Sequence, residues 1–268
     1  MGKKRRDVST SLRDSWIDSW KLKESNGQYE AFIRTFDISS SGIKSRYPCP
    51  NTDGRFYQTL SLNETFKLIH LLRDPTISEI KEQYAVEPVA RSVAFAEELG
   101  IKHPKYPGCS TYIVITWDFL CKTISGSYKV ISVKPQSVIN NKRTRELLTL
   151  ERTLAISMGY EYELALDVDL KTTETQNYIK ASLGAKLAQH LSYLYLVWLP
   201  NFLFCLSEHE DEPLLHSIKE SARVTGMGLQ DAYRLMLHAY WVGDISSDPM
   251  LALLPEFSPW ELGVTVNA

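Results

Sequence analysis

The run TYIVITWDFLCKTISGSYKVISVK at residues 111–134 decides how the first part of the chain folds. From Thr111 to Leu120 it is β-branched or aromatic almost without a break, which predicts a strand buried on both faces. Tyr128 to Val133 repeats the pattern after the turn Ser125-Gly126-Ser127. We therefore expect a hairpin of two central strands.

The expected hairpin brings an acid and a base together. If the turn is centred on Gly126, Asp118 lies directly opposite Lys134, where Cβ atoms of paired residues are roughly 4.5 to 5.5 Å apart. Alternation along the strand puts Ser132 on the same face and turns Ile131 and Val133 to the other. The pattern therefore predicts a carboxylate beside an ammonium group at the open end of an apolar hairpin.

An acid and a lysine on adjacent strands have two interpretations. A metal-dependent phosphodiester nuclease needs a carboxylate to hold a divalent cation and an ammonium group to stabilise negative charge. The same pair is also expected as a simple ion pair at a strand end, and the spacing alone favours this second interpretation. The chain contains no G-x-S-x-G, P-loop, G-x-G-x-x-G or H-E-x-x-H motif that would indicate a different chemistry.

Helices are expected on both sides of this hairpin in the sequence. A helix begins at Ser61, since Ser61-Leu62-Asn63-Glu64 has the S-x-x-E capping form, and ends near Asp74-Pro75. Glu64 is then either the capping partner of Ser61 or a metal ligand. A charged helix from Lys142 to Met158 contains Glu151, which we expect on a solvated face.

The remaining elements complete an α/β fold with a mixed sheet flanked by helices. We expect a turn at Asp53-Gly54, a helix ending at Gly100 and a strand from Tyr160 to Leu166. The polar stretch from Asp167 to Thr175 marks a boundary, which gives domains at residues 1–170 and 171–268. The second is mostly helical, and a glycine turn and two weak strands predict a winged-helix outline with helices at 176–189, 212–223 and 229–240 and strands at 241–248 and 260–266.

Composition limits the classes of function. With 268 residues and a formal net charge of -2, any nucleic-acid contact must depend on local patches. We interpret the basic run at residues 3–6 as a solvated terminus and not as a DNA-binding arm. We interpret the charges at residues 208–212 as a solvated loop and not as a metal site. Four scattered cysteines, at positions 49, 109, 121 and 205, predict a reduced cytoplasmic protein with no zinc site. We expect no membrane segment, and we interpret Leu191–Leu206 as buried core.

Seven short blocks between about residues 35 and 155 resemble the TnsA family, in order along the chain. They are Ser39-Ser40-Ser41-Gly42, Arg55 to Glu64, Ile80 to Tyr84, Gly100 to Pro104, Thr116 to Leu120, Val133 to Pro135 and Leu150 to Arg152. The resemblance implies a catalytic domain with a restriction-endonuclease-like fold. It also implies that Glu64 and Asp118 are metal-binding carboxylates and that Lys134 is the catalytic lysine.

The resemblance further implies a site in which one or two Mg²⁺ ions, with Mn²⁺ as a substitute, are held by Glu64, Asp118 and the Val133 carbonyl. Ser132 departs from the family pattern, which has Gln or Glu there, so Glu151 is a candidate to reach in. TnsA-like proteins cut the 5′ ends of a transposon together with a TnsB-like transposase, and a TnsC-like AAA+ regulator contacts their C-terminal region.

The implied function is therefore a transposon-end DNA endonuclease in the cytoplasm, associated with the nucleoid during transposition. Few lysines and arginines lie between residues 191 and 268, so for the C-terminal domain we favour protein contact over DNA contact. Two alternatives remain. Ser132 is consistent with a catalytically degenerate scaffold that bridges transposase and regulator, and a stand-alone restriction or repair nuclease would cut without partners.

Overall fold

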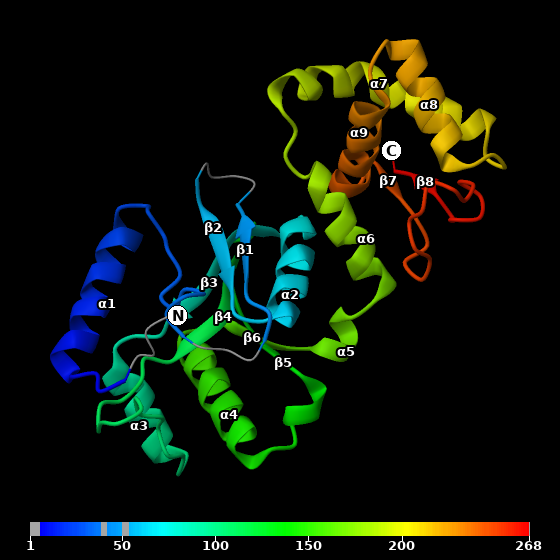
Figure 1. Ribbon diagram of the computed structural model, residues 1–268. Helices are drawn as coiled ribbons and strands as arrows, with labels where there is room; N and C mark the ends of the chain where they lie inside the picture. The colour runs from blue at the N-terminus through cyan, green and yellow to red at the C-terminus, as the bar shows by residue number, and fades with distance from the viewer. Residues whose placement is uncertain (1–5, 39–41, 50–53, 268) are drawn as a thin grey trace. The chain divides into compact units, whose positions relative to one another are not determined.

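The computed structural model describes residues 6–38, 42–49 and 54–267, and divides into two compact units, Met1–Leu170 and Lys171–Ala268. The predicted contributions of Lys3, Lys4, Arg5, of Ser39–Ser41 and of Asp53 lie outside the described residues. We describe each unit by itself (Figure 1).

A four-stranded mixed sheet forms the centre of the first unit. Its strand order is β3 (Ile77–Ala85), β4 (Thr116–Thr123), β5 (Tyr128–Lys134) and β6 (Glu161–Leu166). The first three strands pair antiparallel, and β6 pairs parallel to β5. A parallel pair needs a long crossover, which here is a short 3-10 turn, η1 (Gln136–Val138), and helix α4 (Lys142–Ser157). The predicted mixed sheet with flanking helices is confirmed.

Helices cover both faces of this sheet (Figure 1). Helix α3 (Val89–Glu98) and α4 pack on one face, where Ala96, Leu150 and Leu154 are buried against Leu120 and Val130. Helix α2 (Leu62–Arg73) lies on the other face, where the Lys67 ammonium group pairs with the Glu163 carboxylate of β6 at 2.5 Å. The remaining elements of the unit are α1 (Thr10–Ser25), the antiparallel pair β1 (Ser45–Pro48) and β2 (Phe56–Thr59), and α5 (Asp167–Leu170).

One prediction about the sheet is corrected. The strand expected from Thr111 begins only at Thr116, because residues 111–115 are a loop in which Thr111, Val114 and Ile115 are buried and Tyr112 makes one isolated bridge to Lys105. The β-branched run there reflects burial and not pairing. The polar stretch after Leu166, where the sequence predicts a domain boundary, is occupied largely by α5 and by a helix beginning at Thr173.

The second unit is mostly helical. It contains α6 (Thr173–Ala181), a 3-10 turn η2 (Ser182–Gly184), α7 (Gln189–Glu208), α8 (Leu214–Thr225), α9 (Leu229–Val242) and the strands β7 (Ile245–Ser246) and β8 (Thr265–Val266). Gly226, at φ +68°, ends α8 in the left-handed conformation that glycine favours at a helix C-terminus. Gly184 allows η2 to approach the backbone of α9, since a Cβ there would lie 2.5 Å from the His238 nitrogen.

The winged-helix prediction is not confirmed. The helix expected at 176–189 ends at Ala181, and the expected wing is reduced to β7 and β8, which pair antiparallel over two residues each. Helix α7 is long and apolar enough to cross a membrane, by length and composition only. About a third of its apolar stretch is buried inside the structure. The expectation that Leu191–Leu206 is buried core is therefore correct for one face only, since Trp198 and Phe202 are buried whereas Leu196 is 73% exposed.

Burial of α4 against the sheet predicts an asymmetric response to substitution. Leu154→Ala should lower the free energy of unfolding by about 2–5 kcal/mol, because the side chain is fully buried and its removal leaves a cavity. Ile156→Ala, on the same helix but 57% exposed, should change it by less than about 0.5 kcal/mol. Urea unfolding followed by circular dichroism measures both, and equal effects would contradict this packing.

Candidate active site

Asp118 lies at the open end of the central hairpin, near the point where β4 and β5 separate, and the neighbouring strand holds it by hydrogen bonds. Its Oδ2 accepts a hydrogen bond from the Val133 backbone nitrogen at 2.7 Å and one from the Lys134 ammonium group at 3.0 Å. No hydrogen bond from the described residues reaches Oδ1. The predicted meeting of Asp118 and Lys134 is therefore present in the structure, and it leaves one carboxylate oxygen available.

The register that brings them together differs from the predicted one. Phe119 pairs with Ile131, so Asp118 lies across from Ser132, and Lys134 reaches it diagonally. The cause is the turn, in which Thr123 and Ser127 close a three-residue loop and Gly126, at φ +86°, is its last residue and not its centre. Because the shift is two residues, the three polar side chains keep a common face.

Glu64 lies in the first turn of α2, and its side chain is 7% exposed. Its Oε1 accepts from the Ser61 hydroxyl at 2.8 Å, and its Oε2 accepts from the Leu60 nitrogen at 2.8 Å. The Ser61 oxygen in turn caps the Glu64 nitrogen at 3.2 Å. The capping interpretation of Glu64 is therefore correct, but it is incomplete.

Gln83, which sequence reasoning missed, links Glu64 to the sheet. Its amide nitrogen donates to Glu64 Oε2 at 3.1 Å, and it lies on β3 between the residues that pair with Phe119 and Trp117, hence beside Asp118. Gln83 is 2% exposed and has φ +48°, a conformation that is strained for a non-glycine residue. Neither property has a signature in the sequence.

Glu151 turns toward the sheet and not toward solvent, which corrects the prediction of a solvated face. Its Oε2 accepts from the Ser132 hydroxyl at 2.5 Å. Tyr162, on the neighbouring strand β6, lies close enough for the Glu151 charge to add to the effect of burial, and the two raise the pKa of Tyr162 to about 12. The Glu151 carboxylate is thus the third carboxylate of the site, and the Ser132 hydroxyl holds it by a hydrogen bond.

The charges of these groups influence one another strongly. Burial raises the pKa of Glu64 to about 7, and the negative charge of Asp118 adds to the rise. Burial also raises the pKa of Glu151, against the effect of Lys134. For Lys134, burial acts to lower the pKa, but the charges of Asp118 and Glu151 outweigh it, so the pKa is raised. Near neutral pH Lys134 therefore remains an ammonium ion, whereas Glu64 is partly protonated.

This donor set fits a hard divalent cation. Glu64, Asp118 and Glu151 contribute carboxylate oxygens, which Mg²⁺ prefers. The Val133 carbonyl points to the same side of β5 as its nitrogen, which donates to Asp118. Three carboxylates beside one ammonium group leave excess negative charge when all are ionised, and a cation would neutralise it.

The coupling between Glu64 and Asp118 can be tested directly. Asp118→Asn should lower the pKa of Glu64, because it removes the adjacent negative charge and leaves the Lys134 charge uncompensated. A carboxyl-carbon NMR titration without divalent cations would measure this pKa, with the exposed Glu161→Gln as control. An unchanged or higher Glu64 pKa in Asp118→Asn would show that the two groups are not neighbours.

The part of the chain that carries most of these residues is similar in sequence to known proteins. The model of the TnsA-like endonuclease N-terminal domain matches residues 74–167, which include Asp118, Lys134 and Glu151 but not Glu64. The chain is also 27% identical over 208 residues to the Transposon Tn7 transposition protein TnsA of Escherichia coli, which covers 75% of this chain and 74% of that protein. The chain therefore contains a TnsA-like endonuclease N-terminal domain and is similar to a TnsA transposition protein over three quarters of its length.

Proposed function

We propose that this protein is a Mg²⁺-dependent DNA endonuclease that cuts the 5′ strands at transposon ends, and that residues 1–170 form its restriction-endonuclease-like catalytic domain. The observation that carries the proposal is the bond between Lys134 and Asp118 at 3.0 Å, with Glu64 close enough for its pKa to respond to both charges. Mixed topology of the sheet, with α4 between β5 and β6, supports the proposed fold.

Each side chain has a distinct proposed part. Asp118, Glu64 and the Val133 carbonyl hold one or two Mg²⁺ ions, for which Mn²⁺ can substitute, and Glu151 supplies the carboxylate that Ser132 lacks. When bound, Mg²⁺ polarises the scissile phosphate and lowers the pKa of a coordinated water. Lys134 donates a hydrogen bond to the phosphate as negative charge develops on the phosphate oxygens. Because the pKa of Lys134 is raised, the lysine does not act as a base.

Protons compete with the cation at Glu64. Since the pKa of Glu64 is about 7, lowering the pH through this value adds a proton that a bound cation must displace. Cation affinity therefore rises from about pH 6 to pH 8, and strand cutting at limiting Mg²⁺ rises with it. Lys134, whose pKa is raised by the charges of Asp118 and Glu151, keeps its positive charge over this range.

A basic, aromatic cleft supports DNA as the substrate. The cleft, of about 660 Å³, is lined by four basic side chains, two acidic ones and aromatic rings, and it does not include the three proposed catalytic residues. The guanidinium groups of Arg34 and Arg46 lie over the rings of Phe36 and Phe56, at 4.4 and 4.8 Å from the ring centres. The basic side chains of the lining outnumber the acidic ones, although Arg34 and Arg55 also pair with Asp37 and Glu82. A chain of net charge -2 needs such a local excess of positive charge to bind a phosphate backbone.

We propose that the mostly helical unit of residues 171–268 contacts partner proteins. In this unit, helix α7 presents an apolar stripe to solvent. The stripe lies on one face of the helix and consists of Tyr193, Leu196, Val197 and Phe204. Exposed apolar area of this kind is typical of a protein contact surface. The proposed partners are a TnsC-like AAA+ regulator at this stripe and a TnsB-like transposase in the cutting complex, in the cytoplasm at the nucleoid.

The catalytic assignment predicts loss of cutting in two variants. Asp118→Asn and Lys134→Ala should each reduce nicking of transposon-end DNA by more than about a hundredfold in the presence of the TnsB-like transposase and Mg²⁺, because each removes a charge at the scissile phosphate. Lys122→Ala, on the same strand as Asp118 but outside the site, should cut normally. Undiminished cutting in both test variants would refute the assignment.

Thermal shift separates this function from an inactive scaffold. Mn²⁺ should raise the melting temperature of the wild type more than that of Asp118→Asn, and a scaffold would show no difference. A nuclease that works alone would cut without the transposase, whereas the proposed function requires it.

The partner assignment predicts a selective loss of binding. Leu196→Glu should weaken binding of the TnsC-like regulator of the same transposon by more than about tenfold, because it places a charge in the exposed stripe of α7. Val224→Glu, at a 55% exposed position of α8, is the matched control. Biolayer interferometry measures both, and equal affinities would locate the contact elsewhere.

A further inference from the structure

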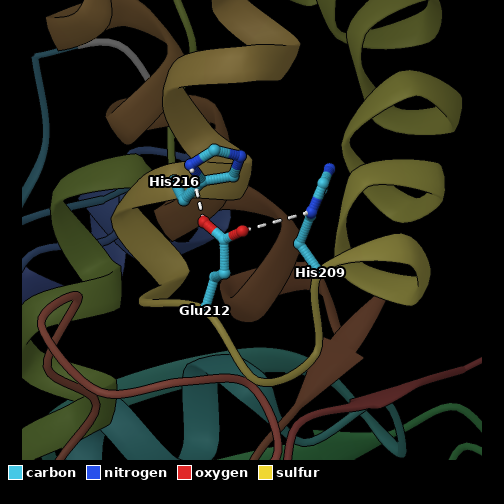
Figure 2. Close-up of side chains that lie close together, drawn as sticks. All are labelled: His209, Glu212 and His216. Carbon is cyan, nitrogen blue, oxygen red and sulfur yellow. Dashed lines mark ion pairs between the residues drawn. The ribbon is translucent and has the colours of Figure 1, made fainter.

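Two histidines and a glutamate converge where α7 ends and α8 begins (Figure 2). His209 is the C-terminal cap of α7, Glu212 lies in the connecting turn, and His216 is in the first turn of α8. The Glu212 carboxylate lies between the rings, 3.7 Å from His209 Nδ1 and 3.0 Å from His216 Nδ1. The rings are 4.7 Å apart between centres.

We propose that His209, Glu212 and His216 form a binding site for a divalent ion of the zinc class, separate from the proposed Mg²⁺ site. One ligand atom from each residue lies within 4.8 Å of the other two. Zinc bound at about 2.0–2.1 Å in tetrahedral geometry needs ligand atoms roughly 3.3 Å apart. The two histidine–glutamate distances lie on either side of that value, but they end on different oxygens of Glu212. Binding therefore requires the three side chains to rotate toward the ion.

The chemistry of the ligands selects the ion. Imidazole nitrogens favour zinc, nickel, copper and cobalt, whereas Mg²⁺ prefers oxygen. Two histidines and one glutamate give three protein ligands and leave a fourth position for water or an external ligand. The side chains of His209 and His216 are 38% and 35% exposed, so an ion can reach them from solvent.

Backbone hydrogen bonds hold this turn in place. The Leu214 nitrogen donates to the Phe257 carbonyl and the Leu215 nitrogen to the Pro255 carbonyl, both at 2.8 Å, and the Trp260 nitrogen donates to the Glu210 carbonyl at 3.1 Å. The segment that carries the three ligands is therefore fixed to the rest of its unit before any ion binds. Adjacent acids at residues 208, 210 and 211 add negative charge that attracts a cation.

The acidic residues of the 208–212 run are exposed, as the sequence predicts, and the proposal adds a ligand role for His209 and Glu212. The acidic run alone indicates nothing, since consecutive carboxylates are commonly exposed without a ligand. What changes its meaning is His216, which is separated from the run by apolar residues and returns to it on the first turn of α8. An ion here would join the end of one helix to the start of the next.

Zinc titration of the full chain tests the site. Isothermal calorimetry with Zn²⁺ alone should show one binding event that excess Mg²⁺ does not suppress. His209→Ala and His216→Ala should each weaken it by more than about tenfold, since loss of a ligand costs at least as much as loss of a residue that orients one. Glu212→Gln, which keeps the side-chain shape, should weaken it as well.

Two controls separate this site from other zinc ligands. His190→Ala removes an exposed histidine of α7 outside the cluster, and Asp118→Asn disables the proposed catalytic site; both should bind Zn²⁺ like the wild type. Co²⁺ binding should give visible absorption bands that the His216 variant lacks. Absence of Zn²⁺ binding, or binding that survives both histidine substitutions, would overturn the proposal, whatever the outcome of the cutting assays.

Discussion

The candidate site depends on how the Asp118 carboxylate is held. One of its oxygens satisfies both the Val133 nitrogen and the Lys134 ammonium group, so the acid is fixed to backbone and side chain of the adjacent strand at once. A partly buried lysine retains its charge only with such a partner, and a carboxylate near other carboxylates is tolerated only with compensating charge. Asp118 therefore stabilises the charged form of Lys134, and Lys134 compensates the negative charge of Asp118.

The same atoms serve folding and the proposed chemistry at α2. Ser61 begins the helix by capping the Glu64 nitrogen, and the Glu64 carboxylate returns to Ser61 and Leu60. This places a buried acid at a fixed point above the sheet, where Gln83 completes its hydrogen bonds. The cost is a left-handed backbone at Gln83, and strain of this kind is often found where a structure is committed to a site.

Much of the fold could be predicted from sequence, because hydrophobic periodicity and capping residues are local signals. The hairpin and α2 were found in this way, and Lys134 was correctly placed beside Asp118 although the register was wrong, because a long side chain spans a diagonal pair. Burial misled the prediction at residues 111–115, where β-branched residues pack in a loop.

Non-local properties could not be predicted. The direction of Glu151 depends on which side of α4 meets the sheet, and the backbone strain at Gln83 depends on neighbours far away in the sequence. The approach of the His209 and His216 rings depends on how α7 and α8 meet. Such relations exist only once the chain has folded, so a single sequence without its relatives contains no direct record of them.

Helix α7 has a further consequence for how this protein behaves in solution. Its inner side is buried around Trp198 and Phe202, while the outer side shows large apolar residues to water. At high concentration, pure samples without a partner would bury that side by associating with themselves or by adsorbing to surfaces. The apparent molecular mass would then depend on dilution, so oligomeric state is meaningful only when measured over a range of concentrations.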